Sequence, residues 1–308
     1  MGKRRSFSCQ YWSLAVIKKD FFSDSATWSD KLFIVLQYVA PQHLLSRLVG
    51  MLAENETPWL KNFLIEKFIR HFRVNMNEAV QSDYKLYHNF NSFFTRPLAD
   101  GARQICAEGI ASPADGQISQ LGKIEYGRIF QAKGQSYSAV ELLGGDAEQA
   151  AKFDDGMFAT VYLSPRDYHR VHMPVAGKLL RSIYIPGDLF SVNATTADNV
   201  PRLFSRNERL VAIFDTQYGE MALVLVGAMI VAGIETVWAG QVSPRQRKIE
   251  EQDFSAPPNP VVLDKGAEMG RFKLGSTAIV LFRKDSGLQW QLAAGDAVQM
   301  GQLLAVKN

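Results

Sequence analysis

Two patterns of apolar residues divide the chain at about residue 100. In the first part, apolar residues recur every three or four positions, as in the run from Leu44 to Leu52, and this period is typical of amphipathic helices. In the second part, short apolar runs are separated by Gly, Pro, Asp and Asn, which is typical of strands joined by turns. We therefore expect an α+β fold, with N-terminal helices and a mainly antiparallel β core.

The first part is expected to contain three amphipathic helices within residues 28–75. Ser29 is a candidate cap for the first helix, Pro41 suits the first turn of the second, and Thr57-Pro58 is expected to open the third. In the third helix four apolar side chains share one face: Leu60, Phe63, Leu64 and Phe68. This face either packs on the main domain or also docks on lipid, and the neighbouring Trp59 favours lipid.

The second part is expected to form strands at four apolar runs: Met157 to Leu163, Leu179 to Ile185, Leu210 to Phe214 and Met221 to Val231. Helical periodicity is scarce after residue 155, which favours the antiparallel β core. The long polar stretch from Gln241 to Pro260 is expected to be an exposed loop.

Charge is distributed unevenly along the chain. The net charge is +3, yet residues 1–75 hold 11 Lys and Arg against 6 Asp and Glu. Basic residues interspersed with Trp, Phe and Leu suit an anionic lipid surface better than nucleic acid. The most apolar stretches do not predict a membrane span, because Phe33 to Ala53 is interrupted by polar residues and Met221 to Ile234 has about 14 residues against roughly 20 required.

The two cysteines, Cys9 and Cys106, lie far apart and form no C-x-x-C pair. They exclude a disulfide framework and a multi-cysteine zinc site, and we expect no metal centre.

Four residues in distant segments could carry chemistry: Asp115, His169, His172 and Ser276. Each alone is better explained as a turn residue or a structural histidine. Together an Asp, a His and a Ser can form a nucleophile, a base and an orienting acid. A serine hydrolase is one interpretation of this set, although the G-x-S-x-G elbow is missing.

A noncatalytic carrier module is another reading, because Gly295 to Gln302 is similar to the turn of biotinyl and lipoyl domains. The lysine tip of those domains is missing.

Several long motifs in the same order closely resemble the bacterial phosphatidylserine decarboxylase proenzymes, from about Trp28 to the C-terminus. These motifs are Phe90–Pro97, Ser112–Gly116, Leu163–Pro174, Pro186–Asn193, Glu235–Gly240 and Phe272–Thr277. The resemblance implies three regions: an extension at 1–27, a helical membrane-association region at 28–99 and a β-rich catalytic domain at 100–308.

The resemblance also implies how a carbonyl cofactor arises, which decarboxylation of an amino acid requires as an electron acceptor. Ser276 would attack the Gly275 carbonyl, and the chain would cleave itself into residues 1–275 and 276–308. Ser276 would become a pyruvoyl group that binds the substrate as a Schiff base. His172 would be the base for cleavage and Asp115 its orienting acid.

The remaining implied roles concern the substrate and its surroundings. His169 would protonate the substrate carbon, because histidine titrates near the working pH. The substrate site would be lined by Gly187, Leu189, Phe190 and Ser191. The expected reaction is phosphatidylserine to phosphatidylethanolamine and CO₂, by a homodimer bound peripherally to an anionic membrane on the cytoplasmic side of the inner membrane, with no nucleic-acid partner.

Overall fold

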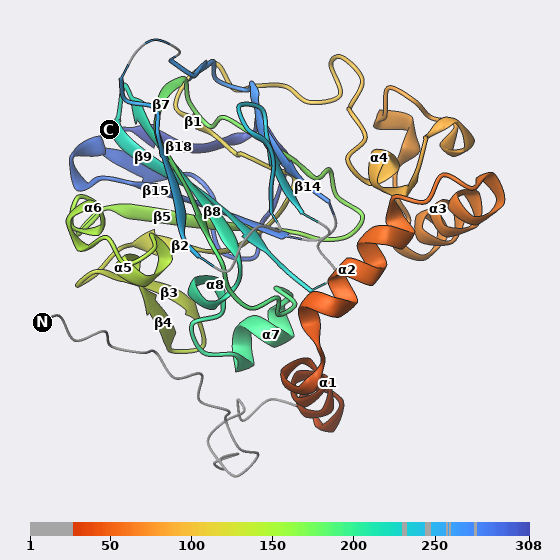
Figure 1. Ribbon diagram of the computed structural model, residues 1–308. Helices are drawn as coiled ribbons and strands as arrows, with labels where there is room; N and C mark the ends of the chain where they lie inside the picture. Colours follow the sequence, from red (N-terminus) through yellow and green to blue (C-terminus); the bar gives the residue numbers. More distant parts are fainter. Residues whose placement is uncertain (1–26, 230–232, 244–247, 257, 259, 274–275) are drawn as a thin grey trace, which may run out of the picture.

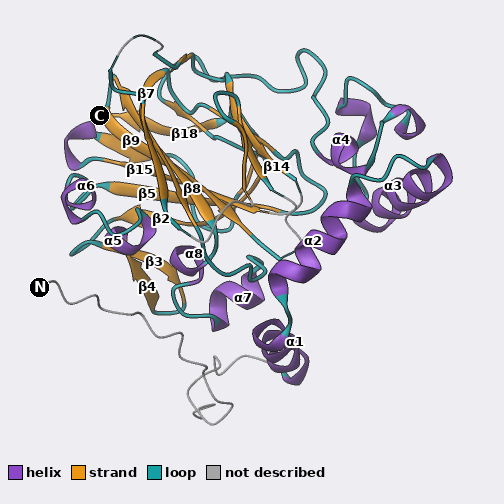
Figure 2. Cartoon of the chain, viewed as in Figure 1, coloured by secondary structure: helices purple, strands orange, loops and turns teal. Residues whose placement is uncertain are grey.

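The computed structural model describes residues 27–229, 233–243, 248–256, 258, 260–273 and 276–308. It has the predicted α+β fold: N-terminal helices lie to one side of a large antiparallel sheet (Figures 1 and 2). The three expected helices are α1 (Trp28–Val39), α2 (Gln42–Ala53) and α3 (Pro58–Phe72). The predicted scissile bond is only half described, because Leu274 and Gly275 lie outside the described residues.

Caps and prolines determine where these helices begin. The Thr27 hydroxyl accepts a hydrogen bond from the Asp30 N–H, and the Asp30 carboxylate accepts one from the Thr27 N–H. This reciprocal capping box stabilises the first turn. The prediction of Ser29 as the cap is therefore wrong, since Ser29 lies inside that turn. Pro41 precedes α2 as its N-cap, and Pro58 opens α3 as predicted.

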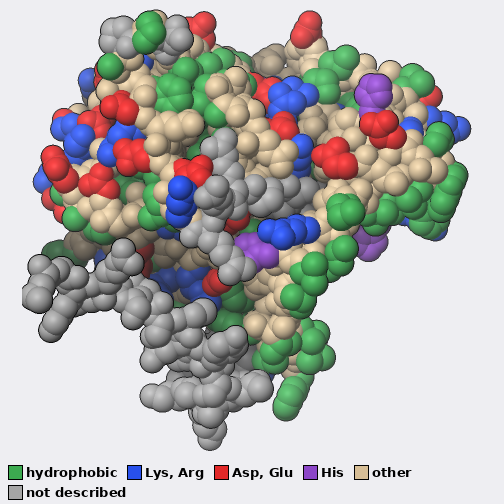
Figure 3. Space-filling model, viewed as in Figure 1, with side chains coloured by type: hydrophobic (Ala, Val, Ile, Leu, Met, Phe, Trp, Pro, Cys, Tyr) green, Lys and Arg blue, Asp and Glu red, His purple; other side chains and the backbone are tan. Residues whose placement is uncertain are grey.

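The helices α1, α2 and the beginning of α3 expose many large apolar side chains, which form green patches beside the β core in Figure 3. The exposed set includes Trp28, Leu32, Leu36, Val39, Leu44, Leu48, Met51, Leu52, Trp59 and Phe63. No single described helix is long and apolar enough to cross a membrane. The pair α1 and α2 meets that criterion in length and composition, but a 90° bend separates the two helices.

Phe68 does not share this exposed surface. Its ring packs edge-on against three rings of α4 (Phe90–Phe94), with centroid distances of 5.1 Å to Phe90, 6.0 Å to Phe93 and 5.8 Å to Phe94. Positions five residues apart differ by about 140° around a helix, so Phe63 and Phe68 face different surroundings. The predicted common face of α3 is therefore divided between solvent and a small aromatic core.

The β core is a nine-stranded sheet with the order β12-β7-β8-β9-β15-β5-β2-β17, in which β13 also pairs with β7. The bounds are β2 (Gly116–Lys123), β5 (Met157–Leu163), β7 (Gly177–Ile185), β8 (Arg209–Thr216), β9 (Gly219–Gly227), β12 (Glu250–Asp253), β13 (Val262–Leu263), β15 (Ser276–Phe282) and β17 (Ala297–Val298). The four predicted strands are present. β5 has the predicted bounds, whereas β9 ends four residues before Val231.

The side chains of β15 alternate between two hydrophobic cores. Ala278, Val280 and Phe282 belong to one core, and Ile279 and Leu281 to the other, as the two-residue period of a strand requires. The first core is covered by the sheets β11-β10-β14-β6 and β1-β18-β16, and the second by the hairpin β3-β4 and short helices. Their bounds are β1 (Ile110–Ala111), β3 (Arg128–Ala132), β4 (Gln135–Ser138), β6 (Arg170–His172), β10 (Ile234–Thr236), β11 (Gly240–Ser243), β14 (Glu268–Phe272), β16 (Leu288–Trp290), β18 (Leu303–Lys307), α5 (Ala139–Leu142), α6 (Ala147–Ala151), α7 (Ala194–Asn199) and α8 (Leu203–Arg206).

The expectation of an exposed loop from Gln241 to Pro260 is only partly right. Residues 241–243 belong to β11, and β12 pairs with β7 at the edge of the large sheet. The sequence of β12 is Glu-Glu-Gln-Asp and is mostly exposed. An edge strand with polar side chains on both faces has no alternating pattern, so its sequence reads as a loop.

Candidate functional site

Ser276 lies at one end of the central strand of the large sheet. It is opposite Leu163 of β5 on one side and Gly227 of β9 on the other. Its side chain is fully buried, and its Oγ makes no hydrogen bond to any described atom. A buried hydroxyl without a partner is destabilising, and such unsatisfied groups in native proteins often mark reactive positions.

His172 lies in β6 and is held at both ring nitrogens. Nδ1 is 2.8 Å from the Gly266 carbonyl, and Nε2 is 2.9 Å from the Tyr168 hydroxyl. Since a carbonyl only accepts, Nδ1 carries the proton and Nε2 is left with a lone pair that accepts from Tyr168. Burial lowers the pKa of His172 below its usual value. The ring is thus a neutral base with its basic nitrogen pointing to a phenol.

Asp115 lies just before β2 and is buried against Arg103. Arg103 donates from Nε to Oδ1 at 3.0 Å and from Nη2 to Oδ2 at 2.5 Å, and the Met300 N–H donates to Oδ1 at 2.8 Å. Arg103 also pairs with Glu78 at 2.8 Å, and these two acids raise the pKa of the Arg103 guanidinium. The carboxylate of Asp115 is therefore held by Arg103, which no motif in the sequence singled out.

The structure brings Asp115 and His172 into the same region without a direct hydrogen bond between them. The His172 N–H donates to the Pro113 carbonyl at 2.8 Å, so the two segments run side by side. The Asp115 charge acts on the His172 pKa in the raising direction, as the smallest of several influences. The predicted role of Asp115 as the acid that orients His172 therefore stays a prediction. So does the role of His172 as the base for Ser276.

His169 is fully buried, with its ring stacked on Phe94 at a centroid distance of 4.0 Å. Burial, and next the charge of Arg96, lower the pKa of His169 to about 3, with the backbone of Pro165 and Ser164 acting in the opposite direction. These two residues follow Leu163, the partner of Ser276. His169 therefore lies toward the Ser276 end of the sheet. It is neutral here, contrary to the expectation that it titrates near the working pH.

The predicted substrate segment packs next to the same end of β9. Leu189 and Phe190 are buried, and a Cβ on Gly227, the partner of Ser276, would lie 3.7 Å from Leu189 Cδ2. Gly187 is required by close approach, because a Cβ there would be 2.2 Å from the Arg206 carbonyl oxygen. The segment is thus anchored one strand away from Ser276.

Two glutamines of the N-terminal helices hold this segment. The Gln42 side-chain oxygen accepts from the Leu189 N–H at 2.7 Å, and that of Gln37 accepts from the Ser191 N–H at 2.8 Å. In the sequence both glutamines served only as polar interruptions of an apolar run. Nothing in the pattern indicated that they bind the backbone of a segment about 150 residues away.

A second unexpected polar group is Glu208, which is buried immediately before β8. Its carboxylate accepts from Tyr184 and Ser243, and burial raises its pKa to about 7. The Gly227 N–H donates to the Glu208 carbonyl at 2.8 Å. Glu208 is therefore two strands from Ser276, and no local pattern predicts that a Glu in Asn207-Glu208-Arg209 is buried.

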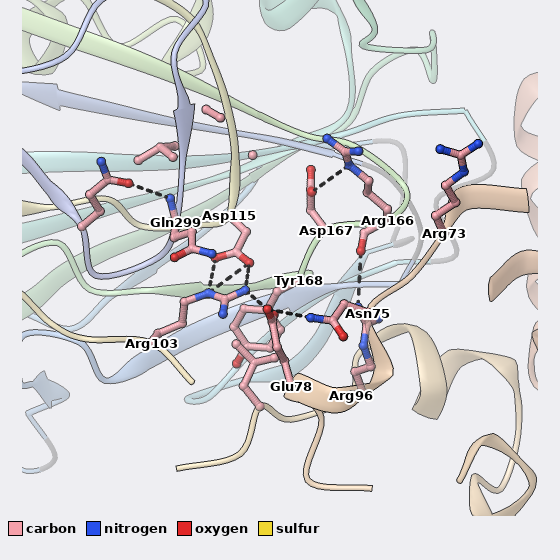
Figure 4. Close-up of a pocket in the computed structure, with 15 residues that line it drawn as sticks. Arg73, Asn75, Glu78, Arg96, Arg103, Asp115, Arg166, Asp167, Tyr168 and Gln299 are labelled. Carbon is pink, nitrogen blue, oxygen red and sulfur yellow. Dashed lines mark hydrogen bonds and ion pairs between the residues drawn. The ribbon is translucent and has the colours of Figure 1, made fainter. Parts of the chain in front are cut away.

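A cavity of about 440 Å³ opens beside Asp115 (Figure 4). Its charged lining combines four arginines with three acids: Arg73, Arg96, Arg103, Arg166, Glu78, Asp115 and Asp167. The turn from Gly295 to Gln302 closes one side, since Val298, Gln299 and Gln302 line the cavity. Among the described residues, no group of three or more His, Cys, Asp or Glu is placed to hold a metal ion.

Comparison with known proteins identifies relatives of this sequence. The sequence profile of the phosphatidylserine decarboxylase family matches residues 90–306, and a profile described as PSD matches residues 32–73. The phosphatidylserine decarboxylase proenzyme of Ectopseudomonas mendocina is 60% identical over 279 residues, covering 89% of this chain and 97% of the relative. The proenzyme of Pseudomonas fluorescens is 59% identical over 284 residues, covering 91% and 99%. That of Stutzerimonas stutzeri is 59% identical over 280 residues, covering 89% and 94%.

Proposed function

The chain belongs to the phosphatidylserine decarboxylase family, and we propose that it converts phosphatidylserine into phosphatidylethanolamine and CO₂ with a pyruvoyl group made from its own Ser276. That group supplies the carbonyl that accepts the electrons left behind by CO₂. The observation that carries the proposal is the fully buried Ser276 Oγ without a partner, at the start of the central strand. A hydroxyl in this state is suited to attack its own backbone.

Overall, self-processing consumes one water molecule and releases one ammonia molecule. The Ser276 Oγ attacks the Gly275 carbonyl, and an ester replaces the peptide C–N bond. Removal of the Ser276 α-proton then breaks the Cβ–Oγ bond and releases the Gly275 carboxylate. Water replaces the nitrogen, which leaves as ammonia. The products are residues 1–275 and a chain of residues 276–308 that begins with the pyruvoyl group.

His172 is the proposed base for the attack. Its neutral ring offers a lone pair on Nε2, which accepts from Tyr168. To take the Ser276 proton, Nε2 must exchange the Tyr168 hydroxyl for the Ser276 hydroxyl. The proposed role of Asp115 is to stabilise the imidazolium formed at this moment, and this requires its carboxylate to turn partly away from Arg103.

His169 is the proposed proton donor to the substrate carbon after CO₂ leaves. Its burial against Phe94 keeps the ring neutral and excludes water from one face. A neutral imidazole donates its single N–H and regains the proton from solvent afterwards. The stacking on Phe94 fixes the plane of the ring, while neither ring nitrogen has a hydrogen-bond partner among the described atoms.

The helices α1 and α2 and the beginning of α3 are proposed to dock on an anionic membrane on the cytoplasmic side. Their exposed apolar side chains and the excess of Lys and Arg in residues 1–75 support this. Gln37 and Gln42 join these helices to Leu189 and Ser191, which would let a headgroup pass from the bilayer to the site without extracting the acyl chains. The homodimer stays a prediction.

The proposed function is tested on purified protein with two measurements. Intact mass is expected to show two chains, the smaller with a carbonyl at its N-terminus that reacts with hydroxylamine. The same preparation is expected to release CO₂ from phosphatidylserine vesicles. A fully active preparation that contains only the whole chain would overturn the proposal.

Membrane docking predicts a large effect of four substitutions on exposed helical side chains. Changing Leu48, Met51, Leu52 and Phe63 to Ser is expected to lower vesicle partitioning more than roughly tenfold, because each buried side chain contributes about 1.5–3 kcal/mol. Co-sedimentation with phosphatidylglycerol vesicles measures it. High salt is expected to weaken binding of the parent without abolishing it, because basic residues are screened and apolar faces are not.

The matched control changes four exposed side chains outside these helices to Ser: Tyr126, Val237, Ile249 and Val262. This variant is expected to sediment like the parent. If both quadruple variants are folded and sediment equally, the helices are not the anchor.

A further inference from the structure

Arg96 is a buried arginine whose hydrogen-bonding groups are mostly unused. Arg96 comes two residues after the end of the aromatic helix α4, and the residue is 3% exposed. Nη2 makes one long contact of 3.4 Å to the Arg166 carbonyl. Nε and Nη1 have no hydrogen-bond partner among the described atoms. A guanidinium offers five N–H donors, and leaving a buried charge so poorly satisfied is costly.

Arg209 shows how the same chain satisfies a buried arginine. It is also 3% exposed, and all three of its nitrogens donate to carbonyls, to Leu142 at 2.8 Å, Asn207 at 2.9 Å and Glu141 at 2.5 Å. Burial alone therefore does not explain the unused donors of Arg96. A partner from outside the described residues does explain them.

Arg96 lines the 440 Å³ cavity beside Asp115 (Figure 4). Two of the other arginines are paired with acids: Arg103 is bound by Glu78 and Asp115, and Arg166 is 3.8 Å from Asp167. Arg73 also lines the cavity, but its side chain is exposed to solvent. The lining holds four arginines and three acids. The cavity thus has a surplus of one positive charge and matches an anion of about one negative charge.

The cavity is next to the predicted proton donor. Phe94, two residues before Arg96, stacks on His169 at 4.0 Å, and the Arg96 charge is the second cause of the lowered His169 pKa. The backbone of Ser164 and Pro165 also acts on His169 and follows Leu163, the strand partner of Ser276. An anion bound at Arg96 would therefore lie on the His169 side of Ser276.

We propose that Arg96 binds the phosphodiester of the phospholipid headgroup in this cavity. The inference rests on the proposed function, in which the substrate carries a carboxylate and a phosphate close together. An arginine on the carboxylate would stabilise the charge that must disappear as CO₂ leaves, which would slow the reaction. The phosphate keeps its single negative charge throughout. A guanidinium matches the geometry of its two free oxygens.

The test measures binding in the full-length Ser276→Ala variant, which keeps the chain continuous. Calorimetry with glycerophosphoserine, inorganic phosphate and serine compares this background with added Arg96→Met, Arg96→Lys and Arg209→Met. Glycerophosphoserine is expected to bind more tightly than serine. Arg96→Met is expected to weaken glycerophosphoserine binding roughly 10- to 100-fold, the usual range for a charged hydrogen bond. Arg96→Lys keeps the charge but not the forked guanidinium. Its affinity for glycerophosphoserine is expected to lie between that of the Ser276→Ala background and that of Arg96→Met.

Arg209→Met is the matched control, since it removes an equally buried arginine. It is expected to lower the melting temperature and to leave the affinity for glycerophosphoserine unchanged. Unchanged affinity in a folded Arg96→Met protein overturns the assignment, and so does an equal loss in Arg209→Met. If Arg96→Met does not fold, parent-like affinity in Arg96→Lys overturns it instead.

Inorganic phosphate separates the two sources of the anion. It is expected to compete with glycerophosphoserine for one site in the Ser276→Ala protein. Phosphate binding that glycerophosphoserine does not displace would show an inorganic anion site and overturn the headgroup assignment. Failure of the proposed function would give a different result. The parent protein would be processed and would bind glycerophosphoserine through Arg96, but it would release no CO₂ from phosphatidylserine.

Discussion

Ser276→Ala is expected to leave the chain whole and without detectable decarboxylase activity. The substitution removes the only atom proposed to attack the Gly275 carbonyl, so neither the cleavage nor the carbonyl group can form. The Ser276 Oγ has no hydrogen-bond partner among the described atoms, and the melting temperature is therefore not expected to fall. Intact mass, thermal unfolding and CO₂ release from phosphatidylserine vesicles measure the three effects.

Thr277 offers a matched control next to Ser276. It is equally buried, and its hydroxyl also has no partner among the described atoms, but it points to the opposite face of β15. Thr277→Val is expected to cleave like the parent. Normal cleavage in Ser276→Ala would show that another residue is the nucleophile.

The two histidines of the Tyr168–Pro174 segment are expected to fail in different ways. His172→Ala should block cleavage, because no base would take the Ser276 proton. His169→Ala should still cleave but decarboxylate about 10²- to 10⁴-fold more slowly, the usual contribution of a general acid. Cleavage is followed by intact mass, and decarboxylation is measured only on the cleaved fraction.

The pH dependence of cleavage gives a second measurement. Only neutral His172 can act as a base, and burial lowers its pKa. Cleavage should therefore persist below pH 6.5, the usual histidine pKa, and decline only as the pH falls through the lowered value.

The exposed His88 is the control for the histidine substitutions, and His88→Ala should cleave normally. Equal cleavage defects in His169→Ala and His172→Ala would contradict the division of roles.

The sequence predicted the architecture better than the contacts within the site. Apolar periodicity located α1–α3 and the strands β5, β7, β8 and β9, because burial of one helix face or of a central strand leaves a period in the sequence. β12 was missed because its exposed polar residues carry no such period. The motifs indicated Asp115, His172 and Ser276, since reactive residue types stood in distinctive local patterns.

What the sequence could not provide was the set of long-range partners. Arg103 binds Asp115 from another segment, and the Gln37 and Gln42 side chains bind a remote backbone. A hydrogen bond to a distant residue leaves no periodic trace in either segment. The burial of Arg96 beside a cavity was not predicted either. The motif Phe90–Pro97 indicates the family resemblance but not which of its side chains faces a cavity.

The place of the proposed break within the sheet has a consequence for refolding. All seven residues of β15 pair with both β5 and β9, and β17 and β18 also pair with strands from the larger product. Cleavage before Ser276 would therefore separate two polypeptides that remain interleaved by backbone hydrogen bonds. Before cleavage, folding is a unimolecular event. Afterwards, recovery from denaturant becomes a bimolecular association whose rate depends on concentration, so processing would turn an independently folding chain into an assembly.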